Sequence, residues 1–549
     1  MVDSARLFAR HGASSTIITT QANASTFQKA IDTDFESGYS IRIHLIPFPA
    51  SQVGLPEGIE NMKDSTSPEI MGKIGRGLHM LKDQVELLFQ VLNADCLVTD
   101  MLYPWTVDSA EKLGIPRLYF YSSSYFSNCA SYSVRKHRPH DGLESDTCKF
   151  FIPDLPHETE MTVLQLAEWI RTKNHSSAQF FDAVFESEKR SYGALYNSFH
   201  ELERDYEEHY KSTMGIKAWS IGPVAAWINN TNKGQKHDHV EELEPEWLKW
   251  LNSMKVESVL YVSFGSLTRL TNAQLVEIAH GLENSGHNFI WVIRKRENDD
   301  DDDNDGDSLL HDFEVRMRKS NQGYIIWNWA PQLLILEHSS VGGIVTHCGW
   351  NSILESLSVG LPMITWPMFA EQFYNEKLLV DVLKVGVAVG VKENKLWMNM
   401  GEKDVVERDM ITNAVKVLMG SDEGSMEMRK RAKKLGDAGK RAIEEGGTSY
   451  NNLIQLIDEL KSLKLSREVS KNRENPENTM TKYNKRSHDN SGSSSMATSF
   501  KFDNNNGSSC GFFAFFQDFY PPLSFYMGCV SFQPLSSLAK REESNVQKL

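Results

Sequence analysis

Residues 342–356 read GGIVTHCGWNSILES and combine two different patterns. Gly342 to Thr346 form a short apolar and β-branched run, which predicts a buried parallel strand. From Asn351 onward the spacing predicts a helix, and the residues from His347 to Trp350 form the turn between strand and helix. Such a turn brings free backbone N–H groups and the positive end of the helix dipole to one point. The stretch therefore predicts an α/β fold with an anion site, suited to phosphate, at this turn.

Polar side chains around the turn could complete that site. His347 can donate to a diphosphate, and Asn351 and Ser352 can add further hydrogen bonds. Glu355 lies one turn further on, where a carboxylate commonly binds ribose hydroxyls in dinucleotide folds. Taken alone, the same residues also fit a structural role, with Ser352 capping a helix and His347 buried and satisfied.

Alternating strand and helix patterns extend on both sides of this stretch. A chain of 549 residues is too long for one core. We expect two doubly wound, Rossmann-like α/β domains at 1–224 and 246–464, joined by a polar linker at 225–245. Residues 465–549 are predicted to be a disordered tail, because 466–509 are rich in Ser, Asn, Lys and Glu. The aromatic patch at 511–532 has no helical or alternating pattern, and we assign it no function.

The overall composition excludes several classes of protein. A formal net charge of −15 argues against a nucleic-acid partner. Glu297 to Asp307 contribute to it, and this run fits a solvated loop better than a metal site. The six cysteines form no C-x-x-C pair, and the chain opens without a signal-peptide pattern. The most apolar tail segment, 511–530, contains Asp518 and two prolines, which a lone membrane span tolerates badly. We expect a cytoplasmic protein with no integral membrane span and no metal.

Two flanking motifs give the stretch a specific context. WAPQ stands at Trp329 to Gln332, and WPMFAEQ ends at Gln372. Here the sequence resembles the plant secondary-product UDP-glycosyltransferases, whose signature box begins W-x-P-Q, contains HCGWNS and ends in D/E-Q or D/E-H. The box from Trp329 to Gln372 has the family's length of 44 residues. The resemblance covers roughly residues 1–464.

The resemblance implies a GT-B fold, in which two Rossmann-like domains face each other across a cleft. It also implies a UDP-sugar co-substrate, no cofactor, and donor-binding roles for the residues of the box. Trp329 would stack on uracil, Glu355 would bind the ribose, and Glu371 and Gln372 would bind the sugar hydroxyls. The remaining implied donor-site residues contact base, ribose or diphosphate or lie beside them: Ser266, Ala330, Gln332, His347, Cys348, Gly349, Trp350, Asn351 and Ser352.

Two positions bear on the sugar. Family members that use glucuronic acid tend to have Arg where Trp350 stands, because a carboxylate needs a cationic partner. Galactose users often have His where Gln372 stands. The resemblance therefore favours UDP-glucose, with UDP-galactose as the alternative.

One half of the family's catalytic pair is present. The run DCLVTDMLYPW is a strand that ends in Asp100, and strand ends carry the sites of α/β folds. In the family, such an Asp orients a histidine base that deprotonates the acceptor hydroxyl, and the reaction inverts the anomeric centre. Capping of a helix is the structural alternative for Asp100.

The histidine of that pair is not found at the expected place. In the family it stands in an H-x-x-P loop after the first strand, and the next helix reads like VDSARLFARHG at 2–12. This alignment places the histidine four residues before Met1, so we expect Met1 to be internal, with the first strand and catalytic loop upstream. The chain as written is then expected to be slow by about 10²–10⁴-fold. His11 is expected at the surface and is no substitute.

The acceptor is the least determined part of the reaction. Segments such as FPASQVGLPEGIE and EHYKSTMGIKAWSIGPV resemble the branch of the family that acts on soyasapogenols. A small apolar triterpenoid is therefore the expected acceptor, with flavonoids as the nearest alternative. Four aromatic residues could line its pocket or belong to the core: Tyr103, Trp105, Tyr125 and Phe126. A monomer is expected. A UDP-sugar binder without transferase activity remains a second hypothesis, and an NAD-dependent oxidoreductase fits poorly because no G-x-G-x-x-G follows a first strand.

Overall fold

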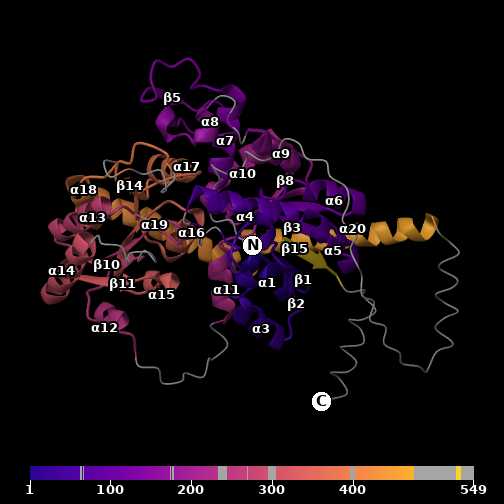
Figure 1. The fold of residues 1–549 in the computed structure, drawn as a ribbon, viewed down its shortest axis with the longest axis horizontal. Coiled ribbons are helices and arrows are strands. Elements are labelled where there is room, and N and C mark those ends of the chain that lie inside the picture. Colours follow the sequence, from indigo (N-terminus) through magenta and orange to yellow (C-terminus); the bar gives the residue numbers. More distant parts are fainter. Residues whose placement is uncertain are drawn as a thin grey trace.

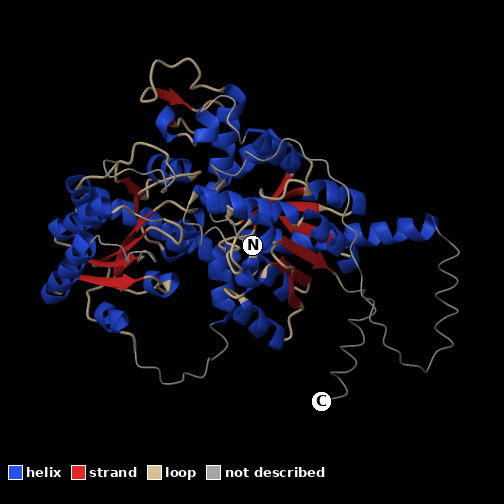
Figure 2. Ribbon diagram, viewed as in Figure 1, coloured by secondary structure: helices blue, strands red, loops and turns tan. Residues whose placement is uncertain are grey.

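The computed structural model describes residues 1–474 and 527–532, apart from 62, 64, 66, 173–174, 176–177, 233–243, 269, 295–303, 396–400 and 402–403. All its strands except a two-stranded hairpin gather into two large sheets, each with helices on both faces (Figures 1 and 2). The expectation of two α/β units is confirmed. The acidic run is described only from residue 304, where a helix begins, and most of the tail lies outside the described residues.

The sheet of the N-terminal domain has seven strands in the order β2-β1-β15-β3-β4-β7-β8. All neighbouring pairs are parallel except the two that involve β15. The strands are β1 (Ser14–Thr19), β2 (Ile41–Leu45), β3 (Cys96–Thr99), β4 (Arg117–Tyr121), β7 (Gly193–Tyr196), β8 (Lys217–Ser220) and β15 (Met527–Ser531). A separate hairpin pairs β5 (Lys149–Phe151) with β6 (Glu160–Thr162).

The sheet of the second domain is parallel throughout, in the order β11-β10-β9-β12-β13-β14. Its centre is β12, in which every residue is buried, as the apolar run in the sequence predicts. The strands are β9 (Val259–Ser263), β10 (Asn288–Ile293), β11 (Gly323–Trp327), β12 (Val341–Thr346), β13 (Met363–Thr365) and β14 (Gly386–Ala388).

Helices connect the strands and cover both sheets. In the first 232 residues they are α1 (Val2–Arg10), α2 (Gln21–Ala24), α3 (Gln28–Glu36), α4 (Pro68–Met80), α5 (Lys82–Leu92), α6 (Thr106–Leu113), α7 (Tyr125–His137), α8 (Glu168–Arg171), α9 (Ala178–Lys189), α10 (His200–Met214) and α11 (Val224–Asn232). Beyond residue 244 they are α12 (Glu246–Asn252), α13 (Asn272–Ser285), α14 (Asn304–Ser320), α15 (Gln332–Leu336), α16 (Trp350–Val359), α17 (Gln372–Lys377), α18 (Arg408–Met419), α19 (Glu423–Ile443) and α20 (Thr448–Glu474). Short 3₁₀ turns span Ser51–Val53 and Val163–Gln165, and a π-helical turn spans Leu378–Val382.

The tail contributes a strand to the first sheet, which corrects the prediction that 465–549 is disordered throughout. β15 lies antiparallel between β1 and β3, where Cys529 pairs with both Thr16 and Leu97 (Figure 1). Met527 and Cys529 join the core on one face of the sheet, and Val530 joins the core on the other. A strand buried on both faces shows no alternating pattern, and β15 therefore could not be recognised from hydrophobic period alone.

Asp95 holds the end of this inserted strand. Its carboxylate accepts the backbone N–H of Phe532 at 2.9 Å and lies 3.0 Å from Lys464 Nζ and 3.2 Å from Arg467 Nη2. Lys464 also donates to the carbonyl of Phe532. Since Lys464 and Arg467 belong to α20, one buried carboxylate ties together β3, the last helix and the tail strand.

Two predicted domain boundaries also need correction. α11 (Val224–Asn232) shows that the first part of the expected linker is helical, and the rest lies outside the described residues. α20 runs ten residues past the predicted end of the second domain, and its apolar residues pack on the first sheet. Leu456 and Leu460 share a buried cluster there with Leu118 and Trp219. Amphipathic spacing marks a buried helical face but does not say which domain buries it.

None of the helices in the described ranges combines the length and apolar character that crossing a bilayer requires.

Candidate active site

A cavity of about 1060 Å³ lies between the two domains. Residues after the carboxyl ends of strands line it from both sides, as expected for doubly wound sheets. The wall from the N-terminal domain includes Asp100, Met101, Leu102, Phe120, Ser122, Asn197 and Val224. The wall from the second domain includes Ser266, His347, Gly349, Trp350, Asn351, Ser352, Glu355, Glu371 and Gln372.

The predicted strand–turn–helix forms the centre of the second wall. β12 ends at Thr346, and α16 begins at Trp350 with Gly349 as its N-cap. Among the described residues no side chain caps the first turn of α16, and Gly349 to Ser352 line the cavity, so the backbone N–H groups of this turn are available to a ligand there. Cys348 adopts a left-handed conformation with φ 64°, which turns the chain sharply between strand and helix. The site is therefore an N–H-rich pocket at the positive end of a helix.

His347 is partly buried and lies against the backbones of two glycines. A methyl group at Gly265 would lie 2.6 Å from its Cε1 atom, and one at Gly349 would lie 2.3 Å from its Nε2 atom. Burial lowers the pKa of His347 to about 4, so the ring is neutral at physiological pH. Its Nδ1 atom has no hydrogen-bond partner among the described residues. A neutral imidazole can donate one N–H to a bound anion without the cost of burying a charge.

A polar triad joins the W-x-P-Q end of the signature box to the first turns of α16. Gln332 Nε2 donates to Glu355 Oε2 at 2.7 Å and to Ser352 Oγ at 3.2 Å. Tyr261 also donates its hydroxyl to Gln332 Oε1 at 3.3 Å. Burial raises the pKa of Glu355, and the Gln332 amide opposes that shift. The carboxylate keeps a second oxygen as an acceptor, which suits a pair of hydroxyl groups.

Glu371 and Gln372 stand at the start of α17, on the same wall. Gln372 Oε1 accepts the backbone N–H groups of Met368 at 2.9 Å and Phe369 at 3.2 Å. This contact fixes the amide orientation and leaves the Nε2 group as a donor. Burial raises the pKa of Glu371, although a hydrogen bond from Ser123 opposes it. The pair thus presents an acceptor and a donor side by side.

Asp100 lines the opposite wall, directly after β3. Its Oδ1 atom accepts the N–H of Leu102 at 2.9 Å, and its carbonyl accepts from Arg117 at 3.1 Å. The nearest helix begins only at Thr106, so Asp100 does not cap a helix. Burial raises the pKa of Asp100 to about 6. A carboxyl group poised near neutral pH in a cleft is a candidate for proton chemistry.

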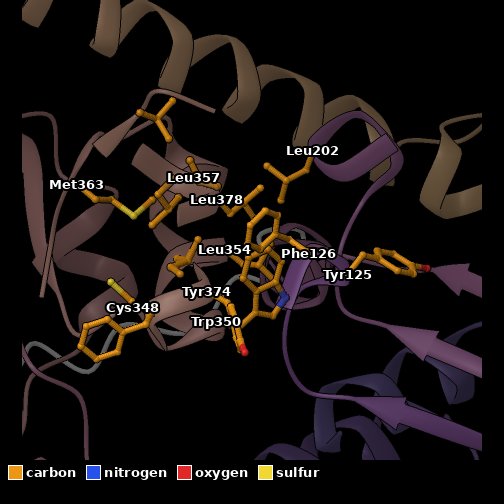
Figure 3. Close-up of a cluster of buried hydrophobic side chains, with 14 of the residues drawn as sticks. Tyr125, Phe126, Leu202, Cys348, Trp350, Leu354, Leu357, Met363, Tyr374 and Leu378 are labelled. Atoms are coloured by element: carbon orange, nitrogen blue, oxygen red, sulfur yellow. The ribbon is translucent and has the colours of Figure 1, made fainter. Parts of the chain in front are cut away.

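Trp350 lines the cavity and also contacts the N-terminal domain. Its indole N–H donates to the carbonyl of Asn197, which follows β7, at 2.8 Å. The ring lies among buried side chains of both domains, including Phe126 and Leu202 on one side and Leu354 on the other (Figure 3). The anion turn is therefore packed directly on the N-terminal domain.

Several predicted site residues lie elsewhere. Trp329 is 75% exposed and, like Ala330 and Gln332, does not line the cavity, although Gln332 reaches it through the triad. The side chain of Cys348 is buried in the core, so only its backbone borders the turn. His11 packs edge-on against Trp227 and Tyr450, where a surface position was expected.

The four aromatic residues considered for the acceptor pocket belong to the core. Tyr103, Tyr125 and Phe126 are each at most 2% exposed, and Trp105 packs with Phe89 and Tyr103. The cavity is instead lined by residues that sequence reasoning missed, among them Met101, Leu102, Phe120, Ser122 and Asn197. Each lies at or near the carboxyl end of a strand in the first sheet, and that position was the available signal.

Comparison with known proteins agrees with this geometry. Residues 78–422 match the family described as UDP-glucoronosyl and UDP-glucosyl transferase. The chain belongs to this family. It is a UDP-glycosyltransferase of plant secondary metabolism, and the sequence-based assignment of family and enzyme class is confirmed.

Two relatives and two solved structures illustrate the similarity. The chain is 52% identical to a soyasapogenol B glucuronide galactosyltransferase from Glycine max, over 87% of this chain and 95% of that protein. It is 41% identical to UDP-glucosyl transferase 73DL1 from Saponaria officinalis, over 85% and 94%. The structure of UGT73P12 from Glycyrrhiza uralensis, complexed with glycyrrhetinic acid 3-O-monoglucuronide, is 49% identical with a TM-score of 0.80 over 86% and 95% of the two chains. That of UGT71G1 from Medicago truncatula, complexed with UDP-glucose, is 23% identical with a TM-score of 0.64 over 84% and 94%. The GT-B fold of this UDP-glycosyltransferase is thereby confirmed.

Proposed function

We propose that this UDP-glycosyltransferase transfers glucose from UDP-glucose to a hydroxyl group of a triterpenoid or its glycoside. The observation that carries the proposal is the second wall of the cavity, which combines an N–H-rich helix start, a neutral histidine and the Glu355 carboxylate held by Gln332. Donors of this kind suit a diphosphate, and the carboxylate suits the hydroxyl groups of a ribose.

The donor residues divide by chemistry. We assign the diphosphate to Ser266, His347 and the start of α16 at Asn351 and Ser352, because these supply donors around one point. The ribose hydroxyls go to Glu355. The ring of Trp329 is 75% exposed and offers an accessible aromatic face on which uracil can stack.

Asp100 is the proposed group for proton chemistry on the opposite wall. Attack of the acceptor oxygen on C1 of the hexose breaks the C1–O bond to UDP and inverts the anomeric centre, and the acceptor proton must pass to a base. We propose that Asp100 has the role of the family's aspartate, which orients a histidine base and stabilises its protonated form. None of the histidines in residues 1–549 stands at the family's position for that base. The donors around the diphosphate stabilise the charge that develops on UDP as it leaves. The reaction needs no further cofactor.

Gln372 is the proposed selector of the sugar. Its amide nitrogen is held toward the hexose side by the two backbone donors that bind its oxygen. The Glycine max relative is a galactosyltransferase. The Saponaria relative is a glucosyl transferase. The family pattern at this position favours glucose for the present chain.

The acceptor class follows from the first wall and from the relatives. Met101, Leu102 and Phe120 give that wall an apolar lining. The Glycine max relative is named for a soyasapogenol glucuronide, and the Glycyrrhiza structure holds a glycyrrhetinic acid monoglucuronide. A triterpenoid carrying a sugar acid is therefore the first acceptor to test.

An acceptor screen tests the proposal. The full chain is incubated with UDP-glucose or UDP-galactose and with triterpenoids, their monoglucuronides and flavonols, and products are identified by mass spectrometry. UDP binding is measured in parallel, which separates transfer from binding alone. The proposal expects a triterpenoid hexoside with UDP-glucose as the better donor. A flavonol product, or faster transfer from UDP-galactose, would contradict the finer assignment.

The cysteines bear on the compartment. Cys96, Cys129, Cys148, Cys348 and Cys529 are free thiols. Free thiols persist in reducing surroundings, which supports the proposal that the protein acts in the cytoplasm. We propose separately that it acts as a monomer.

A further inference from the structure

Asn375 sits where the two domains and the anion turn meet. It lies in α17 and is 0% exposed. Its Nδ2 atom donates to the carbonyl of Cys348 at 3.0 Å, and its Oδ1 atom accepts the hydroxyl of Ser124 at 2.8 Å. A longer contact of 3.4 Å joins Nδ2 to Ser123 Oγ. A single amide thus connects the second domain's anion turn to the loop after β4 in the first domain.

The bond to Cys348 acts on a strained peptide. Cys348 has φ 64°, a left-handed conformation that is unfavourable for a non-glycine residue. A trans peptide directs its C=O and its next N–H to opposite sides. When Asn375 holds the Cys348 carbonyl on the core side, the N–H of Gly349 must face the other way. Gly349 lines the cavity, so this orientation adds an N–H donor to the anion site.

The bond to Ser124 acts on the other domain. Ser124 is the N-cap of α7, and its hydroxyl oxygen accepts the N–H of Ser127 at 3.0 Å while it donates to Asn375. The neighbouring Ser122 lines the cavity, and Ser123 hydrogen-bonds to the Glu371 side chain. The loop of residues 122–124 therefore touches the cavity, the proposed sugar-binding carboxylate and Asn375 at once.

We propose that Asn375 is a positioning residue that couples the seating of the N-terminal domain to the geometry of the diphosphate site. With the residue 122–124 loop in place, the amide is held so that its nitrogen fixes the Cys348 carbonyl and aims the Gly349 N–H at the anion. This inference rests on the proposed donor site. It adds a residue that touches neither substrate and acts through the peptide between Cys348 and Gly349.

Asn375→Asp is the most selective variant, because it keeps the shape and the acceptor oxygen and removes only the donor. As a carboxylate it places a negative oxygen against the Cys348 carbonyl. As a carboxylic acid it donates again, and burial raises the pKa of such a group. We expect UDP to bind the variant about 10-fold more weakly than wild type at pH 8, with the difference shrinking toward pH 5.5. Variant-to-wild-type ratios at each pH remove the part of the titration of the neighbouring Glu371 and Glu376 that both proteins share.

Asn394→Ala is the matched control. Asn394 is 6% exposed, and its amide also bridges the domains, donating to Ala370 O at 2.9 Å and Gln165 O at 3.3 Å, without a contact to the anion turn. If Asn375 merely held the domains together, Asn375→Ala and Asn394→Ala would lower UDP affinity alike. The inference expects a loss for Asn375→Ala and a UDP affinity within about twofold of wild type for Asn394→Ala.

Calorimetric titration of the full-length variants with UDP decides the matter. Absence of UDP binding by the wild-type chain would contradict the donor site itself. Wild-type binding together with unchanged, pH-independent affinity of Asn375→Asp would overturn the role of Asn375 alone. Should Asn375→Ala fail to fold, the pH-dependent recovery of the isosteric Asp variant still decides.

Discussion

Gln332 donates a 2.7 Å hydrogen bond to Glu355, which joins the first residue of α15 to a carboxylate 23 positions later in α16. The same amide nitrogen reaches Ser352 at 3.2 Å. The contact connects the W-x-P-Q end of the signature box to the anion turn at its centre. It also orients the Glu355 carboxylate, which we propose as the group that binds the ribose.

Removal of this carboxylate should weaken nucleoside and nucleotide together. We expect Glu355→Ala to lower the affinity for both uridine and UDP by about 10-fold, because two hydroxyl–carboxylate hydrogen bonds are lost in a half-buried site. Calorimetric titration with the two ligands checks this. A loss for UDP with unchanged uridine binding would place Glu355 at the diphosphate instead.

Gly349→Ala, in contrast, should weaken the binding of UDP and leave the binding of uridine unchanged. Its φ of −66° is open to any residue, but the new methyl group would lie 2.3 Å from His347 Nε2 and must displace the ring. UDP affinity should fall about 10-fold or more while uridine affinity stays near the wild-type value. Equal losses for both ligands would show a general disturbance of the fold.

Asp100→Asn should lower the rate of sugar transfer and raise the free energy of unfolding at neutral pH. Burial raises the pKa of Asp100 from 3.8 to about 6, so the native state binds its proton more tightly than the unfolded state. Stability contributed by this group is therefore lost as the pH rises from about 4 to about 6. The amide removes that loss, and the variant should be more stable than wild type at pH 7.5 by up to about 3 kcal/mol, with little difference at pH 4.

Thermal unfolding at the two pH values measures the change in stability, and a transfer assay measures the change in activity. Transfer should fall by about 10²-fold while UDP affinity is kept, because the donor contacts lie on the opposite wall. A less stable variant at pH 7.5 would contradict the account of Asp100 as a partly buried carboxylate whose charged form destabilises the fold.

Asp95→Ala tests the anchoring of the tail strand. The change leaves Lys464, Arg467 and the Phe532 N–H without their shared acceptor, and we expect a loss of about 2–3 kcal/mol in the free energy of unfolding. Hydrogen exchange should quicken in β1, β3 and β15. The control Asp458→Ala removes an exposed pair with Lys461 and should cost about 0.5 kcal/mol or less. Similar effects of the two changes would argue against a structural role for the tail strand.

Gln372→His should shift the sugar preference toward galactose. The imidazole cannot accept both backbone N–H groups that Gln372 accepts, and it presents its own N–H from a different place. One hydrogen bond of this kind is worth about 0.5–1.5 kcal/mol, so the glucose-to-galactose ratio of kcat/KM should fall by about 2–10-fold. An unchanged ratio would show that another residue selects the sugar.

The sequence predicted the second domain better than the first because its site is local. Strand, turn and helix follow one another within residues 342–356, so hydrophobic period and small-residue spacing suffice to place the anion site. Asp100 was found by the same logic, as a polar residue at a strand end. Contacts between residues far apart in the sequence could not be predicted in this way. Trp350 donates to Asn197, and Asn375 donates to Cys348, and no local pattern indicates either pair.

The sequence did not predict the tail strand β15 or the packing of the last helix α20, for a different reason. β15 is five residues of apolar and small character that pair with strands more than 400 positions earlier. Only the partner strands distinguish it from a short apolar loop. α20 has a clear apolar face, but the surface that buries it belongs to the first sheet, which a pattern within the helix cannot show.

A crystal structure of the full chain with UDP-glucose tests the central claim most directly. The account predicts the diphosphate at the start of α16 beside His347 and Ser266, ribose hydroxyls on Glu355, and the hexose against Glu371 and Gln372 with its C1 atom facing the Asp100 wall. Nucleotide bound away from the α16 start, or a hexose turned away from the Asp100 wall, would contradict it.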